Sequence, residues 1–360
     1  MVDELSRGGY EALSGSIKKK RIALAVLLVL AIAMFFVALM VGSSKMSWGE
    51  SFMALFGQGT PVAVRIVQNV RLPEAIAAAV AGAGLSIAGL IMQSTLKNPM
   101  ASPSTLGVSN AAVFGANLSI IGFAGGFFDT GNHPTEMFSG SNPFATGAVA
   151  FFFALASTVM ILFLCRLRSF SSETVVLAGI ALGTVWTALT TLLQYYATDV
   201  GLSAAVVWSF GDLSRATFKT DWIMFAVVAA GCVFFYLLQW RFNAINADSS
   251  VASTLGVKVE LLRFLALLVA SLITAVCVSC LGIIGFVGII CPHAMRRIVG
   301  NNHRYLIPAS ILSGSFLLLF ASTMGHLIGN GSSLPVGAIT AILGGPFFLF
   351  LIFTRKGGKA

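Results

Sequence analysis

Long apolar runs separated by short polar segments dominate this chain. The runs lie at about 22–41, 75–95, 105–122, 145–165, 174–196, 222–239, 261–281, 283–295, 306–325 and 335–354. A helix of about 20 apolar residues crosses the hydrocarbon core of a bilayer. The pattern therefore predicts an all-α, polytopic membrane protein with about ten transmembrane helices. The eighth run is too short to cross straight and predicts a half-helix packed within protein.

Basic residues predict how these helices are oriented. With the N-terminus in the cytoplasm, ten spans place 17 of the 22 lysines and arginines on the cytoplasmic side and 5 outside, as the positive-inside rule requires. One span more or fewer would scramble this division. We expect a cytoplasmic tail over 1–21, one ten-helix domain over 22–355 and a cytoplasmic tail over 356–360. The longest cytoplasmic loop is predicted at about 241–260, and an extended outer loop at about 123–143.

The composition agrees with a membrane domain. Hydrophobic residues make up 57% of the 360 residues and charged residues only 10%, against roughly 25% charged residues in soluble domains. The net charge of +9 would suggest nucleic acid as a partner of a soluble protein. Here the basic residues follow the membrane topology, so we expect contact with lipid and no nucleic acid.

Glycine is abundant at 37 residues, and much of it lies inside the predicted spans. Gly82, Gly84 and Gly89 mark the second span, while Gly282, Gly285 and Gly288 recur every third residue near the eighth. Small residues allow helix backbones to approach closely, which is how membrane helices pack. We therefore expect a packed bundle.

Recognisable catalytic and metal-binding motifs are absent from the sequence. It contains no G-x-x-x-x-G-K-[ST], H-E-x-x-H or G-x-S-x-G motif, and its 4 histidines and 5 cysteines are scattered. We expect no catalytic residue, no metal site and no cofactor. The 13 acidic residues fall in loops, at span ends or in the tail. Ion-coupled carriers usually need a buried ionisable group, so the pattern argues against ion-coupled transport and favours an external energy source, without indicating which one.

One predicted span carries a polar stripe. Thr184, Thr187, Thr191 and Gln194 recur at helical spacing on one face of the fifth span. The stripe fits the lining of a translocation path, and it fits hydrogen bonding between helices equally well. Gln93, at the end of the second span, is interpreted as a packing residue.

Three longer stretches resemble a known family. The first contains Arg71-Leu72-Pro73, Ala81-Gly82-Ala83-Gly84-Leu85, Gln93, Asn98-Pro99-Met100-Ala101-Ser102-Pro103 and Leu106-Gly107-Val108-Ser109; the second is 252–257; the third contains 282–288, Pro292-His293, Leu334-Pro335-Val336-Gly337 and Gly344-Gly345-Pro346. In this order and spacing they resemble the FecCD/BtuC-like permease family of type II ABC importers, over about residues 22–355. These importers take up iron–siderophores, haem and cobalamin.

The resemblance implies a non-catalytic permease subunit of the bacterial inner (cytoplasmic) membrane. Its expected partners are a second permease chain, two cytoplasmic ABC ATPase subunits and a periplasmic or lipid-anchored binding protein. A homodimer is favoured, and a heterodimer of related permeases stays open. The cargo would be a metal chelate, with ferric siderophore first and haem or cobalamin next. The alternative is an ion-coupled carrier or channel, which a buried carboxylate or ATPase-independent transport would favour.

The resemblance also assigns residues. The ATPase-coupling loop would include Asp248, Ser249, Ala252, Leu255 and Gly256, with the acid one position earlier than in many members. Binding-protein docking would use Arg71, with Glu74 and His326 where relatives often carry arginine, and Arg65 as a substitute. The structural motif residues are Gln93, Asn98, Pro99, Pro103, Gly285, Gly288, Pro292, His293, Pro335, Gly337 and Pro346. We expect Pro99 and Pro103 to end the second span and Gly344-Gly345-Pro346 to break or bend the tenth.

Overall fold

The computed structural model describes residues 2–42, 44, 46–123, 143–167, 172–329 and 333–353, and all regular structure in these ranges is helical. The predicted outer loop lies almost entirely outside the described residues, and so does the C-terminal tail at 356–360. The all-α prediction is confirmed.

Within the described ranges, a helical segment corresponds to each of the ten predicted spans. They are α1 (Val2–Met40), α4 (Leu72–Thr95), α5 (Val108–Asn117) with the π-helical η2 (Leu118–Phe123), α7 (Pro143–Leu167), α8 (Ser172–Tyr195), α10 (Phe218–Leu237), α13 (Val259–Leu281), α14 (Val287–Val299), α15 (His303–Ile328) and α16 (Val336–Phe353). Seven helical stretches of the described chain are long and apolar enough to cross a membrane; the helices at 108–122 and 336–350 are apolar but shorter.

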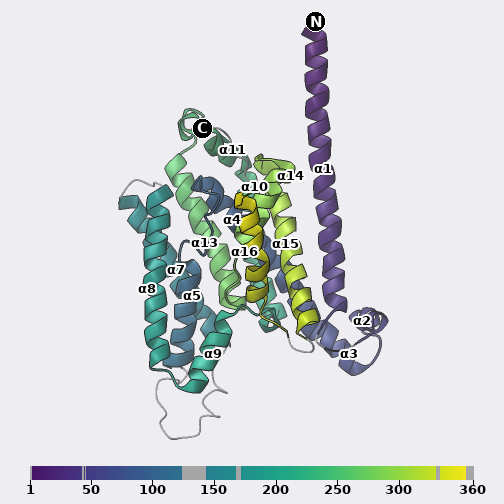
Figure 1. The fold of residues 1–360 in the computed structure, drawn as a ribbon, viewed down its shortest axis with the longest axis vertical. Coiled ribbons are helices and arrows are strands. Elements are labelled where there is room, and N and C mark those ends of the chain that lie inside the picture. Colours follow the sequence, from purple (N-terminus) through teal and green to yellow (C-terminus); the bar gives the residue numbers. More distant parts are fainter. Residues whose placement is uncertain are drawn as a thin grey trace.

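Short helices cover the two ends of the bundle (Figure 1). At one end lie α2 (Trp48–Leu55), α3 (Pro61–Ile66), η1 (Val67–Arg71), α9 (Asp199–Ser209) and η4 (Leu213–Arg215); at the other lie α11 (Gln239–Ala247) and α12 (Ser249–Thr254). The N-terminal end of α1 lies at the same end as α11. We call these the outer and inner ends, following the predicted orientation.

The second span begins earlier than its apolar run indicated. Pro61 starts the helix, where its fixed φ suits the first helical position, and Thr60 caps it by accepting a hydrogen bond from the Ala63 amide at 3.3 Å. The helix then continues through η1 into α4 and forms one 35-residue stretch. Arg71 and Glu74 lie outside the apolar run because they are polar, and their partners within the protein are not visible in the sequence.

Helix α4 lies at the centre of the bundle. Over its most apolar 18 residues, 83% are buried inside the protein, against 11% for the corresponding part of α1. α4 packs against α10, α13, α14 and α15. Two crossings bring backbones into direct contact. A Cβ atom on Gly89 would overlap the carbonyl oxygen of Gly288 in α14, and one on Gly82 would overlap that of Gly314 in α15.

The eighth predicted span is a short helix, as expected, but it is displaced along the chain. α14 has 13 residues and begins after Phe286, which adopts a left-handed conformation with φ 66°. Its residues from Val287 to Pro292 are largely buried by protein, which is where short membrane helices are tolerated. Of the break or bend expected in the last span, a break is not observed, because α16 stays helical through Pro346.

The crossing of α4 and α14 leads to a stability prediction. Gly89→Ala should lower the free energy of unfolding by about 1–3 kcal/mol or more, because the new methyl group meets backbone rather than a movable side chain. Thermal unfolding in detergent measures the effect. Gly49→Ala in α2 is the matched control, since no atom lies within 4 Å of its added Cβ. Equal melting temperatures for the two variants would contradict the close crossing.

Candidate translocation path and coupling site

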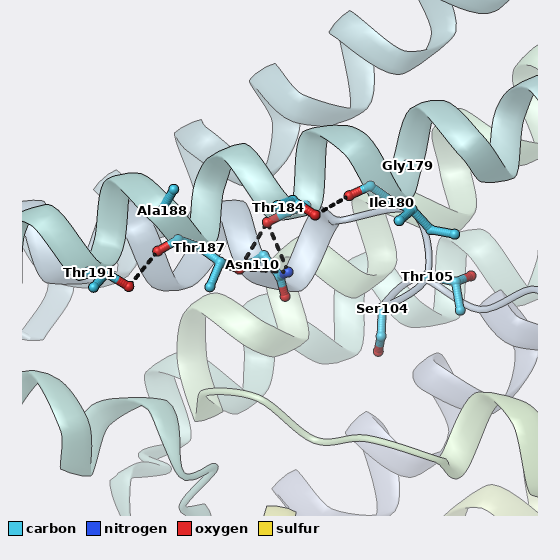
Figure 2. Close-up of a pocket in the computed structure, with 10 residues that line it drawn as sticks. Ser104, Thr105, Asn110, Gly179, Ile180, Thr184, Thr187, Ala188 and Thr191 are labelled. Atoms are coloured by element: carbon cyan, nitrogen blue, oxygen red, sulfur yellow. Dashed lines mark hydrogen bonds between the residues drawn. The ribbon is translucent and has the colours of Figure 1, made fainter.

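The predicted polar stripe lies along one exposed face of α8. Thr184, Thr187 and Thr191 are exposed, and each hydroxyl donates to the carbonyl four residues earlier on its own helix, at 2.9–3.0 Å. These bonds satisfy the hydroxyl hydrogens and leave oxygen lone pairs facing outward. The face is therefore polar without being charged (Figure 2).

Part of the same stripe joins α8 to α5. The Asn110 side-chain amide donates to the Gly183 carbonyl and to the Thr187 hydroxyl, both at 3.2 Å. One turn beyond Thr191, Gln194 donates to Asn117 at 3.0 Å. Both interpretations of the stripe thus have a structural basis, because Gln194 and Thr187 bond between helices while Thr184 and Thr191 face open space.

A hollow of about 470 Å³ lies beside the stripe, within the usual range for small-molecule sites. Its lining comes from the α8 threonines, from Asn110, and from the segment that leads into α5. The lining residues are Ser104, Thr105, Asn110, Gly179, Ile180, Gly183, Thr184, Thr187, Ala188 and Thr191. No residue in this lining is charged. Figure 2 shows Asn110 and the threonines projecting toward the same space between α5 and α8.

The coupling-loop residues form a compact helical corner at the inner end. Asp248 is the N-cap of α12, and its carboxylate accepts from the Ser250 amide at 3.0 Å. This backbone hydrogen bond holds the pKa of the exposed Asp248 carboxyl below its ordinary value. The stability that this cap contributes is therefore fully present above the ordinary pKa of an aspartate, and it is lost as the pH falls through the lowered pKa of Asp248. Arg263 of α13 donates to the Ser249 hydroxyl at 3.2 Å.

The end of α12 is a Schellman motif. Gly256 has φ 79°, its amide bonds the Ser253 carbonyl at 3.0 Å, and the Val257 amide bonds the Ala252 carbonyl at 3.0 Å. Ala252 and Val257 are buried, whereas Leu255 is 61% exposed. The five predicted coupling residues thus lie together, with Ala252 turned inward and Leu255 projecting from the inner end.

The predicted docking residues are mostly buried. Arg71 is 4% exposed, and its guanidinium donates to the carbonyls of Leu39 and Met40 at 3.2 and 2.9 Å and to Ser44 and Ser51. It therefore caps the C-terminal end of α1, where cationic groups are favourable. This geometry leaves the Arg71 guanidinium bonded within the chain and unavailable to a partner in this conformation.

Two further docking candidates bond each other. The Glu74 carboxylate of α4 lies 2.7 Å from the His326 Nε2 atom and accepts from the Ser322 hydroxyl at 2.9 Å, so it joins α4 to α15. Glu74 is 6% exposed. Arg65, on α3, is exposed. Of the four candidates, Arg65 alone presents its side chain at the outer surface, and the docking assignment stays a prediction.

The structural motif residues lie at turns, helix ends and helix crossings. Gln93 donates to the Gly288 carbonyl at 3.0 Å, and Asn98 accepts from the Met100 amide at 2.9 Å in the turn after α4. Pro99 and Pro103 lie between α4 and α5, Gly285 precedes α14, Pro292 and His293 lie within α14, Pro335 precedes α16, and Pro346 lies within α16. At Gly337 a Cβ atom would overlap the carbonyl of Phe210.

One buried acid was not recognised from the sequence. Asp221 belongs to the first turn of α10 and was assigned to a span end, yet it is 3% exposed and neither carboxylate oxygen has a hydrogen-bond partner. Asp221 directly precedes the predicted apolar run at 222–239, so the sequence pattern gave no signal of its burial. In the described part of the chain, no three His, Cys, Asp or Glu side chains are grouped so that they could hold a metal ion.

Comparison with known proteins gives a consistent result. The sequence model of the FecCD transport family matches residues 28–354. A protein of Methanocaldococcus jannaschii described as an ABC transporter permease is 42% identical over 93% of this chain and 95% of its own length. The hemin transport system permease protein HmuU of Yersinia pestis is 31% identical over 93% and 96%.

Other relatives differ in the cargo for which they are named. The molybdate import system permease protein MolB of Haemophilus influenzae is 30% identical over 83% of this chain and 84% of its own length. Among solved structures, an inward-facing conformation of a protein described as a metal-chelate type ABC transporter superposes with a TM-score of 0.78. It is 27% identical and covers 92% of this chain and 98% of its own.

The Schellman motif leads to a local prediction. Gly256→Ala should speed hydrogen exchange at the end of α12, because a Cβ atom in the left-handed conformation costs roughly 1–2 kcal/mol. Exchange of the Gly256 and Val257 amides, followed by mass spectrometry, measures the effect. Gly256→Asn is the matched control, since asparagine tolerates this conformation better. If exchange in Gly256→Ala were no faster than in wild type or in Gly256→Asn, the end of α12 would not depend on the left-handed conformation of residue 256.

Proposed function

This chain belongs to the FecCD transport family, and we propose that it is the permease subunit of a binding-protein-dependent ABC importer. It carries a metal chelate across the cytoplasmic (inner) membrane, with both termini in the cytoplasm. It has no catalytic role, since ATP is hydrolysed by two ABC ATPase subunits. A second copy of the chain completes the path, and a binding protein delivers the cargo at the outer end.

The observation that carries this proposal is the uncharged, hydroxyl-lined hollow between α5 and α8. A carrier that binds its cargo ion in the membrane needs ionisable or closely spaced oxygen ligands. Scattered hydroxyl groups on an open face instead offer weak hydrogen bonds to a large polar solute. Such a surface lets a chelate pass without holding it, and tight recognition is left to the binding protein.

The cargo is proposed as a ferric siderophore first, and haem or cobalamin next. Relatives of similar identity are named for iron(3+)-hydroxamate in Bacillus subtilis, for hemin in Yersinia pestis and for molybdate in Haemophilus influenzae. One permease fold thus accompanies cargoes of different size and charge. A neutral path fits this range, because it attracts no particular charge.

The α11–α12 corner is the proposed ATPase contact. It lies at the end opposite α2, α3 and α9 (Figure 1), and it exposes Val251 and Leu255 together with the α12 cap at Asp248. At the outer end, Arg65 is proposed to contact the binding protein. Docking would also depend on three buried residues that fix the outer ends of α1, α4 and α15 relative to one another, namely Arg71, Glu74 and His326.

Reconstitution tests the proposal. The chain is co-purified with its ABC ATPase and placed in liposomes with binding protein loaded with ferric siderophore, haem or cobalamin. Leu255→Asp should reduce ATPase co-purification and ATP-driven uptake by tenfold or more, since a buried unpaired charge at an interface costs several kcal/mol. Uptake and bound ATPase are both measured.

Leu327→Asp is the matched control, because Leu327 is a similarly exposed leucine, 58% against 61%, near the outer end of α15. It should retain the ATPase. Wild-type protein that holds no ATPase and passes cargo without ATP would reject the importer. Normal coupling in Leu255→Asp would instead remove only the assignment of the contact.

Asp221 favours the alternative, an ion-coupled carrier. A carboxylate buried without partners inside an apolar helix is the feature on which such carriers depend. If Asp221 coupled transport to protons or sodium ions, Asp221→Asn would abolish flux driven by an ion gradient in liposomes without ATPase. We expect the importer instead: no gradient-driven flux in wild type, and ATP-driven uptake in Asp221→Asn within about twofold of wild type, because asparagine keeps the shape of the side chain and removes only its ionisable group.

A further inference from the structure

A continuous set of hydrogen bonds joins the α11–α12 corner to the inner end of α4. We propose that Asn243, His303 and Ser94 are positioning residues that transmit movement of the corner to α4, and that Gln93 extends this connection to α14. The inference rests on the proposed function, since it concerns how an ATPase bound at the corner would move the transmembrane helices.

The first link is the Asn243 side chain on α11. Its Oδ1 atom accepts from the backbone amide of His303 at 2.9 Å and lies 2.9 Å from His303 Nδ1. Its Nδ2 atom donates at 3.2 Å to Asn302, which caps α15 by accepting from the Arg304 amide. A single side chain of α11 therefore binds both the N-cap residue and the first residue of α15.

The second link is the imidazole of His303. The backbone amide of His303 can only donate, which assigns Oδ1 as the atom of Asn243 that faces it. Nδ1 must then carry the hydrogen, so Nε2 is the acceptor. The Ser94 hydroxyl lies 2.9 Å from Nε2 and donates to it. His303 is completely buried and Ser94 is 3% exposed, so no water competes for these bonds.

The third link is the neighbour of Ser94 in α4. Gln93 donates to the Gly288 carbonyl at 3.0 Å and accepts from the Arg296 guanidinium, and both partners lie on α14. Residues 93 and 94 therefore attach α14 and α15 to the same turn of α4. That turn lies just before the segment that leads to the path-lining residues Ser104 and Thr105.

The burial of these groups makes them move together. If α11 shifted alone, the buried backbone amide and Nδ1 atom of His303 would lose their partner on the half-buried Asn243, and a buried donor left unpaired is costly. α14 can follow because it begins at Phe286, whose left-handed backbone marks a strained junction that a change of conformation can relieve.

Two serines of α4 allow an effect on the coupling between α11 and α4 to be distinguished from an effect on the stability of the bundle. Ser86, earlier in the same helix, donates to the Ser310 carbonyl of α15 at 2.7 Å and is completely buried. Ser86→Ala and Ser94→Ala each remove one buried hydroxyl that joins α4 to α15. Only Ser94 connects to α11, so the two variants should differ in coupling but not in stability. Ser94→Thr keeps the hydroxyl and should restore coupling.

The experiment uses the complete transporter in liposomes, with ferric siderophore as the probe, and measures siderophore taken up per ATP hydrolysed. We expect a several-fold lower ratio in Ser94→Ala, and wild-type ratios in Ser86→Ala and Ser94→Thr, with similar melting temperatures for both alanine variants. In hydrogen exchange, ATP binding should change protection at the inner end of α4 in wild type, and only at α11 and α12 in Ser94→Ala.

Each other outcome has a distinct meaning. An unchanged ratio and an unchanged α4 response in Ser94→Ala would overturn the inference while leaving the importer intact. Equal losses in Ser86→Ala and Ser94→Ala would also overturn it, because both serines would then only stabilise the bundle. Wild-type protein without ATP-driven uptake would reject the proposed function, and the inference with it.

Discussion

Direct contact between helix backbones at glycine positions holds this bundle together. Hydrophobic burial gives little drive for helices to associate in lipid, so close packing must supply the attraction. α4 meets α14 where Gly89 faces Gly288, and it meets α15 where Gly82 faces Gly314. At both crossings a single methyl group would collide with backbone. The central position of α4 therefore depends on the absence of side chains at these few residues.

Polar side chains join α4 to its neighbours mainly near its two ends, and Arg71 of η1 directly precedes the outer end. At the outer end Arg71 binds the last carbonyls of α1, and Glu74 binds His326 of α15. At the inner end Gln93 and Ser94 bind α14 and α15. In the proposed coupling, a helix that is bonded at both ends and closely packed between them would move as one unit. Movement at the inner end would therefore reach the rest of the bundle through α4.

The side of the molecule that contains the proposed path differs from α4, because some of its polar groups face open space. On α8 the threonines satisfy their hydrogens within their own helix, so their oxygens stay available on an exposed surface. The adjacent hollow contains hydroxyl and amide groups without charge. This division fits the proposal, in which the closely packed part transmits movement and the open, weakly polar part lets a large solute pass.

The sequence by itself determined the features that depend on local pattern. Apolar runs predicted the spans, and helical spacing placed Thr184, Thr187 and Thr191 on one face. The tertiary structure alone showed that Arg71 and Glu74 are buried, that the second span begins at Pro61, and that Asp221 has no partner. The reason is physical: periodicity specifies the face of one helix, whereas the partner of a buried polar group comes from another helix. Glu74 and His326 are 252 residues apart in sequence, and only the packing of α4 against α15 brings them together.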